Sequence, residues 1–247
     1  MLIQNFARNL KGRDFAVGDI HGYFSLLQQA LADVNFDTEI DRLFSVGDLI
    51  DRGPECTRVL AFLAQPWFFA VRGNHEDYVC RYQTVDEANW LKNGGSWFME
   101  LPSDDQAILC SRLKELPFCI QVETALGPVG IVHADIPFSD WNKTRENLDS
   151  RRVQDFCMWS RRRLQTLDTR HVDGARAVVV GHNALKKVLV LGNVYHIDTT
   201  AWKPDEGGYF TLLNLETLEA YPQIEVGTSG KLSEALMAAE HIREKGC

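Results

Sequence analysis

The feature that most constrains this chain is a set of polar clusters, each of which directly follows a short apolar segment. Five of them occur in chain order, at residues 18–22, 47–53, 72–76, 133–135 and 181–182. In α/β proteins, strand ends that meet at one edge of a sheet are where sites are built. The glycines beside the clusters allow tight turns and close backbone approach. We therefore expect one site assembled from residues far apart in the sequence.

The segments between the early clusters predict a mixed α/β fold. Apolar runs with strand character alternate with helix-spaced apolar residues, in the order 14–17, 24–34, 42–46, 54–64 and 67–71. Pro54 is expected at the first position of the second of these helices. This βαβαβ order implies parallel strands.

The middle of the chain is predicted to be mostly helical, and the later part is predicted to form a second group of strands. Ser103-Asp104-Asp105-Gln106 has the pattern of a capping box for a helix ending near Leu116. Strands are expected at 118–123, 129–132, 177–180, 188–191, 194–197 and 209–213. Gly127-Pro128 and Gly192-Asn193 predict hairpin turns. A terminal helix is expected over Lys231–Lys245, within a C-terminal extension from about 225 to 247 of a single domain that covers 1–247.

Composition excludes several classes of protein. The chain has 247 residues with 26 basic and 34 acidic side chains, for a formal charge of -8. Such a chain repels nucleic-acid backbones at long range, so we expect no nucleic-acid partner. Residues 1–12 lack the apolar core that is typical of a signal peptide, and we expect no bilayer-spanning segment, because the most apolar stretch, residues 60–71, is too short. The six cysteines form no Cys-x-x-Cys pair and are expected to be free thiols in a cytoplasmic protein without a membrane partner. Oligomeric state is left open.

The clusters offer oxygen and imidazole donors suited to divalent cations. The candidate ligands are Asp19, His21, Asp48, Asn74, His133 and His182. Such donors, without thiolates, fit manganese, iron or zinc. Six side chains are too many for one open catalytic ion and about right for two. Asp48, from the middle cluster, is the natural candidate to bridge them.

The charges of such a site favour a phosphate substrate. Two divalent ions carry four positive charges, of which Asp19, Asp48 and a bridging hydroxide cancel three. Arg52 and Arg72 lie beside the ligand clusters, where guanidinium groups can bind phosphate oxygens. Two metal ions can activate a water for in-line attack at phosphorus.

His75 and Asp51 remain as candidates for proton transfer. His75 follows Asn74 directly, and adjacent side chains usually diverge, so both need not bind metal. A histidine can protonate a leaving alkoxide near neutral pH. Asp51 could hold the histidine ring in the correct tautomer. We therefore expect His75 to be a general acid oriented by Asp51.

The ordered motifs Asp-x-His-Gly, Gly-Asp-x-x-Asp-Arg-Gly, Gly-Asn-His-Glu, His-Ala-Asp and Gly-His resemble the phosphoprotein phosphatase family of metallophosphoesterases. The likeness is greatest to bacterial and bacteriophage lambda-type serine/threonine protein phosphatases, and residues 93–98 also resemble a segment of those enzymes. The resemblance implies a four-layer αββα, calcineurin-like sandwich with a dinuclear, usually manganese-activated site. One ion would be held by Asp19, His21 and Asp48, and the other by Asp48, Asn74, His133 and His182.

The resemblance also implies roles for particular residues. Arg52, Arg72 and Arg161 match phosphate-contacting arginines, and the assignment of Arg161 rests on the likeness alone. His75 and Asp51 match the acid and its partner. The implied substrates are phosphorylated proteins or peptides carrying phosphoserine or phosphothreonine, with phosphotyrosine left open.

Two other functions compete with this interpretation. A symmetrical dinucleoside polyphosphate hydrolase would share the metal motifs, but Asp51 and Glu76 favour the protein phosphatase by similarity. A metal-binding interaction module without activity is disfavoured by the complete set of ligands, acid and arginines. The sequence departs from the family at 195–200, where an insertion or a register change adds His196, which we interpret as structural. The tryptophans are interpreted as core or groove packing.

Overall fold

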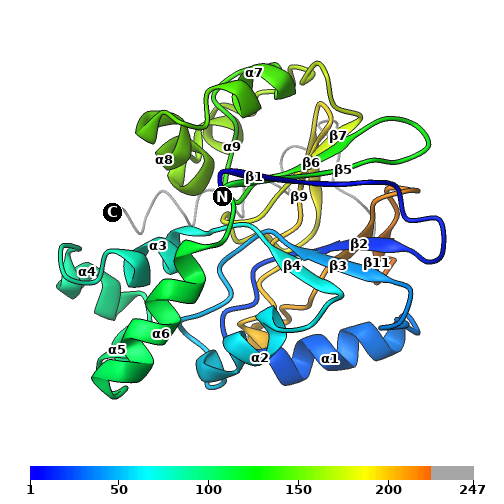
Figure 1. The fold of residues 1–247 in the computed structure, drawn as a ribbon. Coiled ribbons are helices and arrows are strands. Elements are labelled where there is room, and N and C mark those ends of the chain that lie inside the picture. Colours follow the sequence, from blue (N-terminus) through cyan, green and yellow to red (C-terminus); the bar gives the residue numbers. More distant parts are fainter. Residues whose placement is uncertain (224–247) are drawn as a thin grey trace.

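The computed structural model describes residues 1–223 and has four layers. Figure 1 shows two β-sheets between helices, with α1 (Phe24–Asp33) and α2 (Val59–Leu63) below one sheet. The helices α7 (Trp141–Glu146), α8 (Arg151–Trp159) and α9 (Arg162–Thr166) lie above the other. This is the predicted αββα sandwich.

The first sheet contains the strands that carry the early polar clusters. Its five strands run in the order β11 (Ala220–Tyr221), β10 (Leu212–Asn214), β2 (Asp14–Val17), β3 (Arg42–Ser45) and β4 (Phe68–Ala70). β2, β3 and β4 are parallel, as the alternation of strands and helices predicts. Their carboxyl ends therefore meet at one edge.

The second sheet has six strands and carries the later clusters. Its order is β1 (Ile3–Phe6), β5 (Cys119–Val122), β6 (Val129–Ile131), β7 (Ala177–Val180), β9 (Val194–His196) and β8 (Leu189–Leu191). β6 and β7 are parallel, so the loops that follow them also leave from one edge. The two predicted hairpins are present as the antiparallel pairs β5–β6 and β8–β9.

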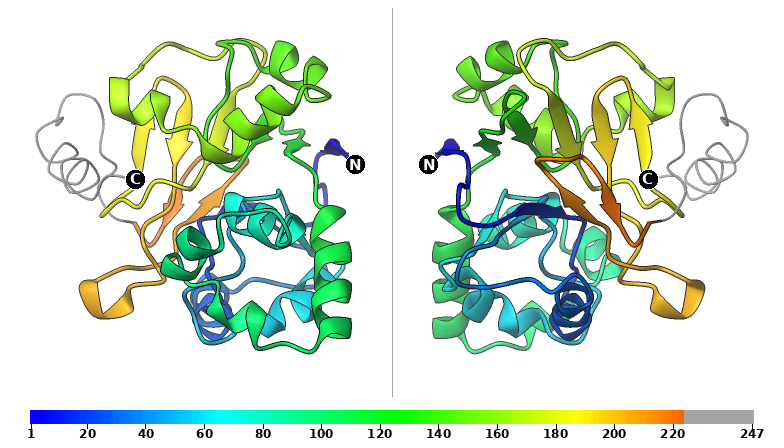
Figure 2. Two further views of the ribbon diagram at one scale, coloured as in Figure 1. Left: turned by 90° about the vertical axis from the view of Figure 1, so that its left-hand side faces the viewer. Right: turned by 90° about the vertical axis from the view of Figure 1, so that its right-hand side faces the viewer.

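The remaining helices cover the side of the molecule at which the site lies. They are α3 (Asn74–Cys80), α4 (Glu87–Lys92), α5 (Ser96–Met99) and α6 (Ser103–Lys114), and two 3₁₀ turns lie at Cys56–Arg58 and Pro204–Glu206. Figure 2 shows α6 standing along the edge of the five-stranded sheet and the loop around Pro204–Glu206 projecting from the body.

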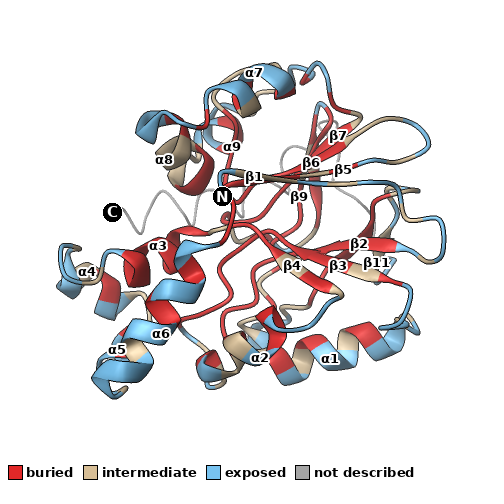
Figure 3. Ribbon diagram, in the orientation of Figure 1, coloured by how far each residue is buried: buried red, intermediate tan, exposed pale blue. Residues whose placement is uncertain are grey.

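Apolar side chains from both sheets form the central core. Phe44 and Val46 of the first sheet pack with Ile131 and Val179 of the second, and all four are fully buried. Both faces of each sheet are covered, which is why the inner strands β2, β6, β7 and β10 are buried at every position rather than at alternate ones. Figure 3 shows the inner strands as almost continuously buried. This core fixes the two strand edges relative to each other.

The expected elements are largely confirmed, with three corrections. Ser103 does not cap α6: the helix cap is Pro102, and no side-chain cap bond forms. Gln106 instead donates to the carbonyls of Phe98 and Leu101, which holds the preceding turn. The helix predicted from Pro54 begins only at Cys56, as a 3₁₀ turn, and the backbone N–H of Glu55 before it donates to the Gly22 carbonyl.

The third correction concerns the last predicted strand, which begins at Leu212 rather than Tyr209. Tyr209 instead bridges the loop at Thr200, and its N–H donates to Thr199. The expected terminal helix lies outside the described residues. Five cysteines are described; all are free, as predicted, and all are buried. Within residues 1–223, no helix has both the length and the apolar character to cross a membrane.

Candidate active site

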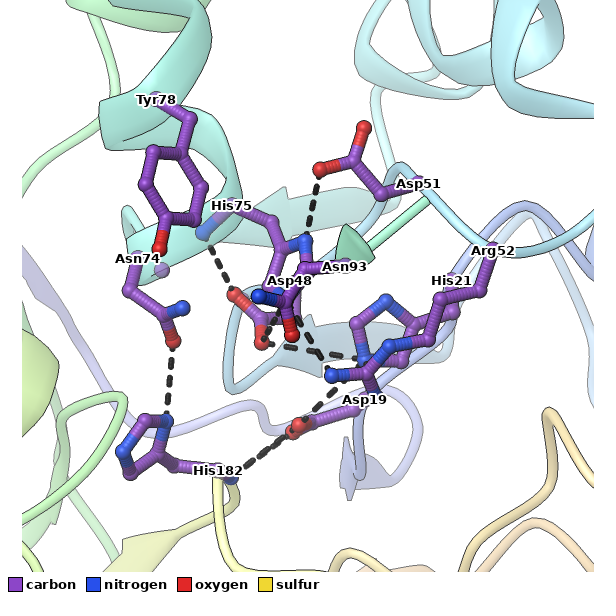
Figure 4. Close-up of polar contacts among 12 residues, drawn as sticks. Asp19, His21, Asp48, Asp51, Arg52, Asn74, His75, Tyr78, Asn93 and His182 are labelled. Atoms are coloured by element: carbon purple, nitrogen blue, oxygen red, sulfur yellow. Dashed lines mark hydrogen bonds and ion pairs between the residues drawn. The ribbon is translucent and has the colours of Figure 1, made fainter. Parts of the chain in front are cut away.

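The predicted ligands converge at the edge where the strands of both sheets end. Asp19 and His21 follow β2, Asp48 follows β3, and Asn74 begins α3 after β4. His133 follows β6 and His182 follows β7. Figure 4 shows the labelled members of this group pointing toward one another from separate segments. All six side chains are buried.

Backbone strain is concentrated at the same residues. His21, Asp48, Asp51, Arg52 and His182 have φ values of 46°, 49°, 68°, 69° and 64°. Residues other than glycine rarely adopt this left-handed backbone conformation, and each instance costs about 1–3 kcal/mol of conformational energy. The surrounding structure must therefore hold these turns, which is a common property of functional sites.

One group of donors forms around His21. Its Nε2 lies 3.9 Å from Oδ2 of Asp19 and 3.8 Å from Oδ2 of Asp48. Its Nδ1 is 2.9 Å from the Ile50 carbonyl. When Nδ1–H donates to that carbonyl, the Nε2 lone pair faces the carboxylates, which is the arrangement of metal-binding histidines.

The other group forms around Asn74. Its Oδ1 lies 2.8 Å from Nε2 of His133 and 2.9 Å from Nδ1 of His182. Asp48 reaches this group as well, with Oδ1 3.3 Å from Nε2 of His133. Nδ1 of His133 is held by the Val46 carbonyl at 2.8 Å.

Asp48 is the residue that the two groups share. The donor atoms of His21, Asp48 and His75 lie within 4.8 Å of one another, and so do those of Asp48, His133 and His182. This placement supports the predicted bridging position. His75 falls in the first group by distance, but its Nδ1 is bonded to Asp51, as described below.

The electrostatics of the site call for positive charge. Burial, together with Asp198 and Asp48, raises the pKa of Asp19 well above its usual value. Burial would also raise the pKa of Asp48, but the charge of His133 and its hydrogen bond hold it well below the usual value. The pKa of His133 is raised by Asp48 against the opposing effect of burial. Buried carboxylates of this kind require positive charge nearby.

Arg52 supplies another positive charge at the other group. Its Nη1 lies 2.7 Å from Nε2 of His21, and its Nη2 lies 3.3 Å from Nε2 of His75. The residues present therefore fit a pair of divalent cations, because they are oxygen and imidazole donors and the Arg52 guanidinium lies against the Nε2 atom of His21. Binding of a cation to His21 would free Arg52 for another partner.

Glu76 joins two of the clusters, a role that the sequence did not reveal. Its carboxylate accepts backbone N–H bonds from Asp48, Leu49 and Gly73 at 2.8–2.9 Å. Burial and the charge of Asp48 raise its pKa to about 7. By tying the loop after β3 to the start of α3, Glu76 sets the distance between Asp48 and Asn74.

The predicted acid and its partner are in contact. Nδ1 of His75 lies 2.6 Å from Oδ2 of Asp51, and both side chains are buried. Nε2 of His75 faces Oδ2 of Asp48 at 3.7 Å. The ring is therefore held at one nitrogen and presents the other to the site (Figure 4).

The three predicted phosphate-binding arginines are placed differently. Arg52 lies in the site, as described above. Arg161 donates from Nη1 to Oδ1 of Asn183 at 2.9 Å and to the His182 carbonyl at 3.3 Å. Burial lowers the pKa of Arg161, and the charges of Asp48 and Asp19 oppose that shift.

Arg72 is the predicted site residue that the structure does not bring to the cluster. Its Nη2 donates to the carbonyls of Lys114 and Leu116 at the end of α6. Its guanidinium lies 4.7 Å from the centre of the Phe118 ring. A contact between Arg72 and phosphate stays a prediction.

Other residues of the site were missed or underrated in the sequence. Asp198 is buried beside Asp19, and the likeness of 195–200 to a family motif was the signal that could have found it. Trp90 and Trp97 pack in or against the core, as predicted, and their indole nitrogens also donate to Asp51, which the sequence did not reveal. His196 lies outside both donor groups and is buried, in keeping with a structural role.

Comparison with known proteins decides the family. The family described as Calcineurin-like phosphoesterase matches residues 15–204. The chain belongs to this family. The resemblance stated from the motifs is confirmed, and so is the sandwich fold.

The relatives include two kinds of phosphoesterase. The chain is 38% identical to serine/threonine-protein phosphatase 1 of Salmonella typhimurium over 210 residues, covering 82% of this chain and 91% of that protein. It is 34% identical to the symmetrical bis(5'-nucleosyl)-tetraphosphatase of Hamiltonella defensa over 133 residues, covering 53% of this chain and 46% of that one.

A solved structure agrees with the fold. A protein serine/threonine phosphatase from Saccharomyces cerevisiae matches with a TM-score of 0.63 at 16% identity, covering 85% of this chain and 76% of that one. At this identity the match supports the calcineurin-like sandwich and not a particular substrate.

Proposed function

We propose that this calcineurin-like phosphoesterase is a protein phosphatase that hydrolyses phosphoserine and phosphothreonine monoesters. The observation that carries the proposal is the pair of donor groups that share Asp48, with His75 and Asp51 beside them. The similarity to a bacterial serine/threonine-protein phosphatase extends over 82% of this chain, whereas that to the tetraphosphatase extends over 53%. Phosphotyrosine is a further candidate substrate.

Two divalent ions, with manganese as our first choice and iron or zinc as alternatives, are proposed to occupy the donor groups. Asp19, His21 and Asp48 would hold one, and Asp48, Asn74, His133 and His182 the other. When bound, the ions would neutralise phosphate charge and increase the acidity of a water molecule. Asp48 would keep both ions in one site.

The chain's own residues perform the remaining tasks. Arg52 and Arg161 bind and orient the phosphate oxygens, since the first guanidinium lies against His21 and the second against the His182 carbonyl. His75 protonates the leaving oxygen from Nε2 as the phosphorus–oxygen bond breaks, and it regains the proton from solvent. Asp51 holds the other nitrogen and stabilises the charged ring. A cytoplasmic location remains part of the proposal.

A metal titration against a panel of phosphoesters tests this function. The chelated full-length chain would receive Mn²⁺, Fe²⁺ or Zn²⁺ and be assayed on phosphoserine, phosphothreonine and phosphotyrosine peptides and on diadenosine tetraphosphate. We expect metal-dependent turnover with the highest kcat/KM on the phosphoserine or phosphothreonine peptides.

Two results would redirect the proposal. A higher kcat/KM on diadenosine tetraphosphate would assign the chain to the nucleotide hydrolases. Binding of metal without turnover of any phosphoester would support an interaction module.

A further inference from the structure

The carboxylate of Asp51 has more partners than a histidine alone requires. Nε1 of Trp97 donates to Oδ1 at 2.6 Å, and Nε1 of Trp90 donates to Oδ2 at 2.8 Å. His75 shares Oδ2 at 2.6 Å. Asp51 is fully buried, so each oxygen depends on protein donors rather than water. Both oxygens are thus fixed by indole N–H groups.

The two tryptophans come from a segment that lies directly on the strained turn at Asp51. They lie in α4 and α5, which are joined by Gly94 and Gly95. A Cβ atom at Gly94 would lie 2.4 Å from the backbone nitrogen of Arg52, and one at Gly95 would lie 2.3 Å from Nε1 of Trp90. The glycine pair therefore permits the close approach that brings both indoles to Asp51.

The two indoles differ in their surroundings. Trp90 is fully buried and packs against Tyr78 and Phe98, with ring centres 5.9 Å and 5.3 Å apart. Trp97 is only partly buried and contacts Phe98 edge to face at 6.0 Å. Trp97 can therefore lose its N–H with less disturbance of the core than Trp90.

We propose that Trp97 and Trp90 are positioning residues for the acid, which they hold through Asp51. Their N–H groups fix the plane of the carboxylate, and Asp51 in turn fixes the ring of His75. Nε2 of His75 then faces the leaving oxygen. The inference rests on the proposed function because it assigns these tryptophans to the step in which His75 gives up its proton.

The dependence on leaving group separates positioning from simple packing. An alkoxide such as that of serine needs a proton as the phosphorus–oxygen bond breaks, whereas p-nitrophenolate leaves without one. A tryptophan that acts through the acid should therefore affect a phosphoserine peptide far more than p-nitrophenyl phosphate. A packing residue should affect both substrates equally.

The experiment compares Trp97→Phe with Trp141→Phe. Phenylalanine keeps an aromatic ring at position 97 and removes the N–H. Trp141, the first residue of α7, is a matched control, because its Nε1 donates to Oε1 of Gln121 at 2.8 Å and not to Asp51. For Trp97→Phe we expect kcat on the phosphoserine peptide to fall by about 10–100-fold with KM nearly unchanged. On p-nitrophenyl phosphate we expect a fall of less than about threefold.

A double-mutant cycle with Asp51→Asn supplies a second measurement. If Trp97 acts through Asp51, adding Trp97→Phe to Asp51→Asn should lower kcat no further. Equal losses on both substrates, additive losses in the cycle or loss of bound manganese from Trp97→Phe would each overturn the inference. If the wild-type chain does not hydrolyse the phosphoserine peptide at all, the proposed function fails instead.

Discussion

Residues from the five-stranded sheet and residues from the six-stranded sheet reach the same site, but different contacts hold them there. The site residues that follow the first sheet are held by other residues that follow strands of the same sheet. Glu76 accepts hydrogen bonds from the N–H groups of Asp48 and Gly73, and the Ile50 carbonyl orients His21. These partners all follow β3 or β4.

The histidines of the second sheet are oriented by the first. The Val46 carbonyl holds Nδ1 of His133, and both oxygens of Asp19 lie 3.1 Å from the backbone nitrogen of His182. Asn74 contacts both rings. The comparison teaches that His75 and Asp51 belong to one half of the molecule, whereas the predicted ligands His133 and His182 depend on contacts between the two sheets.

Asp48 lies at the junction of the two halves, so its replacement should have the largest effect. Asp48→Asn removes the shared charge and should weaken binding at both metal positions, with kcat/KM falling roughly 10⁴-fold. Elemental analysis after manganese reconstitution and gel filtration would measure the loss. Full occupancy at both positions in this variant would contradict bridging.

Replacing His75 tests whether the proposed general acid can be removed without disturbing the two metal positions that share Asp48. His75→Asn should lower kcat on a phosphoserine peptide by about 10²–10⁴-fold and leave both metal ions bound. Steady-state kinetics and metal analysis on the same sample would separate the two properties. Loss of one ion would instead make His75 a ligand, as its distance to Asp48 permits.

Arg161 and Arg72 sharpen the comparison because Arg161 contacts residues after β7, next to the donor groups, whereas Arg72 contacts the end of α6. Arg161→Ala should lower kcat/KM about 10–100-fold through the loss of a charged hydrogen bond to phosphate. Arg72→Ala should instead lower the free energy of unfolding by about 1–3 kcal/mol, since its guanidinium binds carbonyls at the end of α6. Kinetics together with urea unfolding would show which arginine does which. A large kinetic effect of Arg72→Ala with unchanged stability would place it at the phosphate.

The smallest effect is expected at His196, in the second sheet but outside the site. Neither ring nitrogen has a hydrogen-bond partner among the described residues, and burial lowers its pKa to about 3. The unfolded chain takes up a proton below a pH of about 6.5 while the folded protein does not, so stability falls as the pH falls. Because of His196, the free energy of unfolding should fall by roughly 1–2 kcal/mol as the pH is lowered from 6.5 to 5.

His196→Leu provides the check on that pH dependence. The variant should be as stable as the wild type at pH 7 and lose less stability on acidification, as measured by urea unfolding of the metal-free protein at both pH values. An unchanged pH dependence would mean that the ring accepts a proton inside the fold.

Much of this organisation could be predicted from the sequence, because the motifs follow strands directly. Asp19 and Asp48 each come within three residues of an apolar strand, so their meeting at one edge follows from parallel pairing. The contact between His75 and Asp51 followed from residue chemistry. The ends of helices and strands were less predictable. Ser103 and Gln106 do not form the predicted capping box, because the Gln106 side chain donates to the carbonyls of Phe98 and Leu101 in the preceding turn.

Contacts between distant side chains could not be predicted from spacing. Glu76 reads as one more residue of a motif until its three N–H partners are seen. The sequence predicts only apolar packing for Trp90 and Trp97, because no sequence pattern shows which atom accepts the hydrogen bond of an indole N–H. Arg72 stands beside a ligand in the chain, yet its side chain is long enough to reach α6 instead.

Anomalous scattering from crystals of the manganese-reconstituted chain tests the central claim most directly. We predict two peaks on either side of the Asp48 carboxylate, with Nε2 of His75 bound to neither. A single peak, or two peaks without Asp48 between them, would contradict the account.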